Sequence, residues 1–160
     1  MKLRAIAFVS LGSVFFLACS KGAVSKIPHI ALMALYPLTD SMKVNTDTAY
    51  IEFSLADGDG DIGYNSPTTG DTSQIYLKDS RFDSAGFVPT QFPAIDVTIE
   101  DPKKGLEGTC IFFPVPQPAP RTDSVHQATG HDTLTYQLYI TDRAGHHSDT
   151  IRTPALVVRL

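Results

Sequence analysis

The sequence contains no tryptophan, and its 13 basic residues are outnumbered by 17 acidic ones. The formal net charge is −4, and lysine and arginine form no cluster along the chain. A protein that binds nucleic acid needs a basic surface to neutralise phosphates, so the composition argues against a nucleic-acid partner. The lack of tryptophan also argues against a sugar-binding platform or a glycosidase cleft, because both rely on large aromatic rings.

The chain after its first eighteen residues also lacks the 3.6-residue apolar spacing of a helix. Apolar residues instead alternate with polar ones, most clearly over residues 48–56. Further strand candidates are residues 29–36, 74–78, 94–100, 106–113, 133–141 and 151–160. The segments between them, including 39–47, 79–90 and 142–149, are polar or turn-rich and are expected to be irregular. About seven strands at this spacing predict an all-β fold, an immunoglobulin-like antiparallel β-sandwich, with another small antiparallel sandwich or barrel as the alternative.

The chain begins like a secretory signal peptide. Lys2 and Arg4 precede an apolar run, residues 5–18, that is too short to span a membrane comfortably. Residues 16–19 (FLAC) resemble the lipobox of bacterial lipoproteins, in which the signal is cut before a cysteine that then becomes lipidated. The resemblance implies lipidation of Cys19, whereas an ordinary signal peptide followed by a chance cysteine is the alternative.

This start divides the chain into a lipoprotein signal peptide (residues 1–18), a small polar tether (19–28) and one domain (29–160). Loss of Lys2 and Arg4 changes the formal charge to −6. With Cys19 lipidated, Cys110 has no partner, and no disulfide framework is expected. By analogy with lipoprotein sorting signals, Ser20 favours the outer membrane over the inner one. The expected location is thus the bacterial cell envelope, with the lipid bilayer as a partner.

Two stretches together resemble a known group of proteins. They are residues 53–63 (FSLADGDGDIG) and 139–149 (YITDRAGHHSD). The pair is similar to uncharacterised lipoproteins of the Bacteroidota type, which carry an immunoglobulin-like domain behind a lipobox. The resemblance implies a location and a fold rather than an activity. In that group asparagine commonly follows the glycine of the late stretch, where this chain has His146.

The early stretch contains three carboxylates at alternate positions, Asp57, Asp59 and Asp61, separated by glycine. Carboxylates held this closely repel one another unless a cation lies between them, and glycine lets the backbone curl around such an ion. Ca²⁺ takes six to eight oxygen ligands and suits this pattern. An EF-hand is excluded, because its sixth and twelfth positions would be Ile62 and Thr68. We predict a calcium loop of another type; a solvated acidic turn is the alternative.

Asp142 is the candidate for a fourth carboxylate ligand. In a sandwich of seven strands, the loop after the second strand and the loop after the sixth lie at the same pole. Asp142 opens the later of these two loops. The predicted calcium ligands are therefore Asp57, Asp59, Asp61 and Asp142.

The histidines and Cys110 do not form a pattern that is typical of a catalytic site. His146 and His147 are adjacent, but a zinc site needs three or four ligands, and a solvated loop tip is the expected setting. His126 and His131 are expected in surface loops. Cys110 stands among apolar residues that would raise its pKa and make the thiol inert, so we expect a buried core cysteine rather than a nucleophile.

The sequence thus predicts a broad class of function but identifies no substrate. We expect a non-catalytic envelope module that is stabilised by calcium and has a binding or structural role, with a protein or glycan partner of unknown identity. The alternative is a small envelope hydrolase or an enzyme inhibitor that uses the acidic loop directly.

Overall fold

The computed structural model describes residues 25–39, 41–63, 73–92, 105–115, 117–123 and 128–160. Over these residues the chain is all-β, as the alternation predicts, and no helix among them is long and apolar enough to cross a membrane. The elements are β1 (His29–Tyr36), β2 (Ser41–Lys43), β3 (Tyr50–Asp57), β4 (Gln74–Asp79), the 3₁₀ helix η1 (Ser80–Ala85), β5 (Val88–Gln91), β6 (Leu106–Phe112), β7 (His131–Leu134), β8 (Tyr136–Thr141), β9 (Ile151–Arg152) and β10 (Leu156–Arg159).

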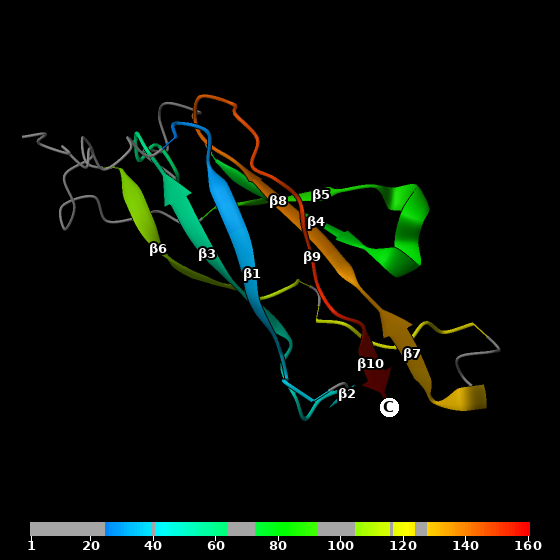
Figure 1. Cartoon of the computed structure of the whole chain (residues 1–160). Coiled ribbons are helices and arrows are strands. Elements are labelled where there is room, and N and C mark those ends of the chain that lie inside the picture. The colour runs from blue at the N-terminus through cyan, green and yellow to red at the C-terminus, as the bar shows by residue number, and fades with distance from the viewer. Residues whose placement is uncertain (1–24, 40, 64–72, 93–104, 116, 124–127) are drawn as a thin grey trace, which may run out of the picture.

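The described strands form three sheets with the orders β1-β3-β6, β5-β4-β8-β9 and β2-β10-β7. The first two sheets form the two layers of a sandwich-like fold, and the third closes one end (Figure 1). The sheet pairings are antiparallel apart from β2 with β10, which is parallel. Strand order in the two main sheets corresponds to the two-sheet arrangement of immunoglobulin-like sandwiches, so the fold class predicted from the sequence is confirmed.

Strand β3 shows how the core leads to the acidic loop. Its side chains alternate between buried and half-buried along the whole strand. Ile51, Phe53 and Leu55 face the core and are at most 4 % exposed. The next inward position is Asp57, which is fully buried and ends the strand. The period of two therefore carries the first carboxylate of the loop into the interior, where an apolar residue would otherwise be expected.

The strands differ from the sequence prediction in four places. The expected strand 133–141 is divided into β7 and β8, and 151–160 into β9 and β10. Two short strands, β2 and β5, lie in segments that we expected to be irregular. Every residue of β5 is exposed, so the strand has no apolar alternation to reveal it, and its Pro89 fits the sheet edge. The expected strand 94–100 lies outside the described residues.

A buried ion network fixes β7 to the segments around it. Asp132 is only 3 % exposed and accepts hydrogen bonds from the Arg121 Nε atom at 3.0 Å and the Thr133 backbone N–H at 2.8 Å. The Arg81 guanidinium lies 3.4 Å from the same carboxylate and also binds Asp79. Burial alone would raise the pKa of Asp132, but these hydrogen bonds and the charge of Arg121 lower it to about 2. The carboxylate is thus held ionised inside the fold.

Candidate metal centre

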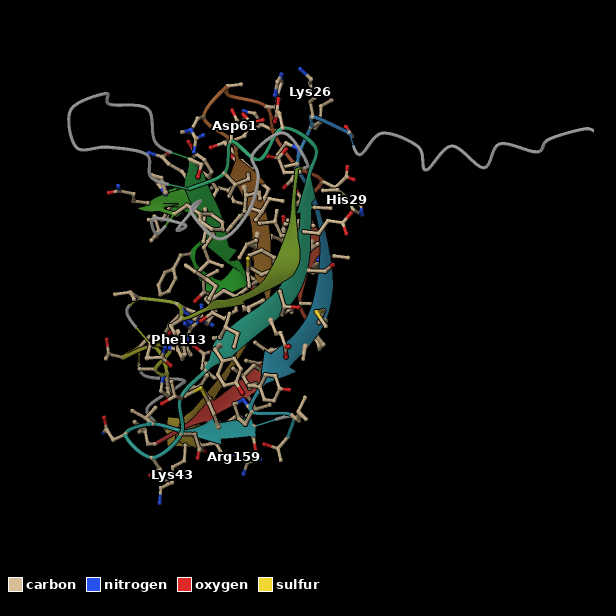
Figure 2. All side chains as sticks on the ribbon, turned by 90° about the vertical axis from the view of Figure 1, so that its left-hand side faces the viewer. Lys26, His29, Lys43, Asp61, Phe113 and Arg159 are labelled. Carbon is tan, nitrogen blue, oxygen red and sulfur yellow. The ribbon has the colours of Figure 1, made fainter. Side chains whose placement is uncertain are left out.

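The three aspartates of the early loop lie together at one pole of the domain. Asp57 ends β3, and the chain then turns through Asp59 and Asp61 before it reaches the buried Ile62. One carboxylate oxygen from each aspartate lies within 4.8 Å of the other two. Figure 2 shows Asp61 at the end of the domain where the chain enters, near Lys26. The group has the composition and spacing to hold a metal ion, as the sequence predicts.

Each of the three carboxylates keeps one oxygen without a hydrogen-bond partner. The Oδ1 atoms of Asp57, Asp59 and Asp61 are all buried and unpaired. A buried acceptor that is left without a donor costs roughly 1–3 kcal/mol, and more when it is charged. Three such oxygens at one point are rarely tolerated unless a positive charge is placed between them. This arrangement could therefore hold a cation.

The second oxygen of each carboxylate lies near a donor or a positive charge. The Asp57 Oδ2 atom accepts a hydrogen bond from the backbone N–H of Asp61 at 2.9 Å, which closes the loop on itself. The Asp61 Oδ2 atom accepts one from the backbone N–H of Ala144 at 3.0 Å. The Asp59 Oδ2 atom lies 4.0 Å from the Lys26 ammonium. The two hydrogen bonds fix the Asp57 and Asp61 carboxylates, while the exposed Lys26 only lies near Asp59.

Glycine is required next to this loop. Gly105 has a φ of +77°, and a Cβ atom at this position would lie 2.6 Å from the carbonyl oxygen of Asp57 and 3.1 Å from Gly58. Real Cβ atoms essentially never approach a backbone oxygen so closely. The turn before β6 can therefore pass behind the acidic loop only because residue 105 has no side chain.

The late loop, residues 142–149, supports the early one from the side. The backbone N–H of Arg143 donates to the carbonyl oxygen of Asp61 at 3.2 Å. Its guanidinium donates to the carbonyl oxygens of Ile62 and Gly63 at 3.3 and 3.4 Å. The sequence predicts no role for Arg143, because no neighbouring residue indicates which carbonyls its side chain reaches. The two loops therefore act as one unit around the aspartates.

Asp142 lies at the same pole, as expected, and is buried with 2 % exposure. Its Oδ1 atom accepts a hydrogen bond from the backbone N–H of His146, and its Oδ2 atom is paired with the His146 Nδ1 atom, both at 2.7 Å. Both oxygens are thus engaged by His146, and the convergent group of described residues comprises the other three aspartates only. The role of Asp142 as a fourth ligand stays a prediction.

His146 lies exposed in the late loop, as the sequence predicts, but it is not free there. Its side chain is 45 % exposed, but its ring is held by the fully buried Asp142 carboxylate. His147 stacks on Tyr139, with 5.4 Å between the ring centroids. His131 lies exposed in β7 rather than in a loop, and His126 and Cys19 lie outside the described residues. The spacing of residues in the sequence predicts neither the stacking of His147 on Tyr139 nor the contact of His146 with Asp142.

Cys110 is half-buried on β6 and packs against the core rather than lying fully inside it. Burial raises the pKa of its thiol to about 11. Such a thiol carries almost no thiolate at neutral pH and is a poor nucleophile, as the apolar sequence around it predicts.

The electrostatics of the pole favour the uptake of positive charge. Burial, followed by the neighbouring charges of Asp59 and Asp61, raises the pKa of Asp57 to about 6. Burial and the charges of Asp142 and Asp59 raise the pKa of Asp61. The hydrogen bond and charge of Asp142 raise the pKa of His146. Burial is the main cause of the two carboxylate shifts, whereas burial opposes the shift of His146, and the hydrogen bond and negative charge of Asp142 outweigh it.

These shifts predict the pH dependence of the cation-free domain. The pKa of Asp57 is about 6 in the fold and 3.8 in an unperturbed chain, so the folded state holds its proton more tightly. The resulting stabilisation is fully present below pH 4 and is lost as pH rises through 6. We expect urea denaturation in chelator to show a domain that gains stability as pH falls from 7 to 5. Asp57→Asn should remove much of this gain; an identical slope in wild type and variant would contradict the assignment.

Comparison with protein-family models, curated proteins and solved structures gives no match for this chain. The strongest indication of function is the acidic pole, the end of the domain that carries Asp57, Asp59 and Asp61.

Proposed function

We propose that this chain is a non-catalytic, calcium-binding module of the bacterial cell envelope, with a binding or structural role. One observation carries the proposal: three carboxylates lie together at the end of β3, and each has a buried oxygen without a partner. A cation there would remove their mutual repulsion and would tie the end of β3 to the loop that follows it. The ion would thus act on the stability and shape of the pole.

Calcium is the cation that best suits the donors. The convergent group offers carboxylate oxygen only, with no thiolate or imidazole, which disfavours zinc and copper. The site lies on a glycine-containing loop that can adjust to the irregular geometry of Ca²⁺, whereas Mg²⁺ demands a near-ideal octahedron and keeps several waters. Three carboxylates supply only part of a calcium shell, so water, backbone carbonyls or Asp142 would complete it.

Isothermal titration calorimetry tests this part of the proposal. We expect the folded chain to bind one Ca²⁺ with a Kd of roughly 10⁻⁴ to 10⁻³ M, the range of extracellular calcium modules. Mg²⁺ should bind at least about tenfold more weakly, because it loses water reluctantly. Equal affinity for the two ions would overturn the choice of calcium, and no heat for either would overturn the site itself.

The envelope location rests on the sequence of residues 16–19 and on the resemblance to lipoproteins. We propose that Cys19 carries the lipid and that the bilayer is the partner reached through it. The acidic pole adjoins residue 25, the first described residue, so the proposed ion site would lie at the anchored end of the domain.

Mass spectrometry of the mature protein from a lipoprotein-processing bacterium tests the anchor. We expect a diacylated or triacylated N-terminal Cys19, and a Cys19→Ser variant that leaves the membrane fraction or retains its leader. An unmodified mature N-terminus in wild type would contradict lipidation and leave the calcium proposal untouched.

A further inference from the structure

Residues 25–28, which precede β1, are held against the acidic loop. The carbonyl oxygen of Ser25 accepts a hydrogen bond from the backbone N–H of Gly58 at 2.7 Å. The Ser25 Oγ atom accepts a second one from the N–H of Ile27 at 3.0 Å, and Pro28 is buried. The sequence places these residues in the tether, residues 19–28. Their contacts show that the last part of that segment packs on the domain.

The main contact of this segment lies within the proposed ion site. Gly58 is the residue between Asp57 and Asp59, so its backbone position depends on how the two carboxylates are arranged. Lys26 lies beside Asp59, but its side chain is 77 % exposed and the Nζ–Oδ2 distance is 4.0 Å, so this ion pair is weak. The hydrogen bond from Gly58 is therefore the principal link between the segment and the loop.

We propose that ion binding at Asp57, Asp59 and Asp61 is coupled to the docking of residues 25–28; the inference rests on the proposed function of the site. Without a cation, repulsion among the carboxylates loosens the loop and displaces the Gly58 donor. With a cation, the loop is fixed and the donor is presented to Ser25. Because coupling between two binding events is reciprocal, docking of the segment must strengthen ion binding by the same factor.

The coupling would regulate the length of the free tether. Residues 25–28 are four residues, and an extended chain spans at most about 3.3–3.6 Å per residue. Release of the segment would therefore add up to roughly 14 Å of reach between the domain and its proposed anchor. Loss of calcium would let the domain move further from the membrane, and binding of calcium would draw it back.

Cleavage of the mature chain by endoproteinase Lys-C, which needs no calcium, tests the coupling. The peptide bond after Lys26 lies in the docked segment, whereas Lys43 is exposed in β2 at the opposite end of the domain (Figure 2). We expect saturating Ca²⁺ to slow cleavage after Lys26 at least about fivefold more than cleavage after Lys43, which reports general stabilisation. Equal slowing at the two sites, with calcium binding shown by calorimetry, would overturn the coupling while the ion site stands.

Deletion of residues 20–26 tests the reciprocal effect. The shortened lipoprotein lacks the Ser25 carbonyl, so we expect its affinity for Ca²⁺ to fall at least about fivefold. Lys26→Gln is the matched control: it keeps the docked backbone and removes a positive charge near the ion, so its affinity should be unchanged or slightly higher. Unchanged affinity in the deletion variant would overturn the coupling. Absence of binding in wild type would overturn the ion site and the coupling together.

Discussion

Replacing Asp57 with asparagine is expected to weaken calcium binding by at least about 100-fold, because changes even to the partners of metal ligands cost 10–100-fold. The same change should leave the calcium-free domain as stable as wild type or more stable. Asparagine can still accept the hydrogen bond from the Asp61 N–H, and its amide can donate toward the unpaired oxygens of the neighbouring aspartates. Calorimetry and urea denaturation in chelator measure the two effects separately.

Asp149→Asn is the matched control for this change. Asp149 lies on the late loop at the same pole, but its side chain is 83 % exposed and pairs only with His29 at 3.5 Å among the contacts of the described residues. Removal of its charge should change calcium affinity less than about threefold, since exposed charges are screened. If Asp57→Asn and Asp149→Asn had similar effects, the ion would be held by the general charge of the pole and not by the three convergent oxygens.

Asp132→Ala is expected to destabilise the domain by about 3–5 kcal/mol, the cost of breaking a buried ion pair by removing one partner. The alanine would remove the acceptor of the Arg121 Nε donor, and Arg81 would keep its ion pair with Asp79. The backbone N–H of Thr133 would lose its acceptor as well. The free energy of unfolding from urea titration measures the loss.

The control for this prediction is Asp47→Ala, at an exposed position where the carboxylate accepts one hydrogen bond from the N–H of Lys43 at 2.7 Å. We expect this change to cost about 1 kcal/mol or less. A similar small cost for Asp132→Ala would mean that the ion network is dispensable. Calcium affinity should be unaffected by Asp132→Ala, because the network lies away from the acidic pole.

The fold and the centre of the site follow from patterns that are local in the sequence. Alternation along residues 48–56 predicts β3, and continuing the same period of two places Asp57 inward. The spacing of Asp57, Asp59 and Asp61 then predicts a convergent group, because glycine separates them. These features depend on residues that are close together in the chain, so sequence reasoning reaches them.

The supporting contacts could not be predicted, because they join residues that are distant in the sequence. Arg143 reaches the carbonyl of Ile62 from 81 positions away, and Arg81 reaches Asp132 from 51. Only the fold brings such pairs together, and lone arginines occur throughout a typical surface. Strand β5 could not be predicted for another reason. All of its side chains are exposed, so its sequence has no alternation of apolar and polar residues.

Thermal unfolding of wild type in calcium and in chelator tests the central claim most directly. At 10 mM Ca²⁺ and the expected Kd, binding to the folded state adds about 1.4–2.7 kcal/mol of stability. Since 1 kcal/mol shifts the Tm of a domain of this size by roughly 2–8 °C, we predict a rise of several degrees in calcium. Asp57→Asn should abolish most of this rise. An identical Tm for wild type in the two buffers would contradict the claim and would mean that the three aspartates form a loop that binds no calcium.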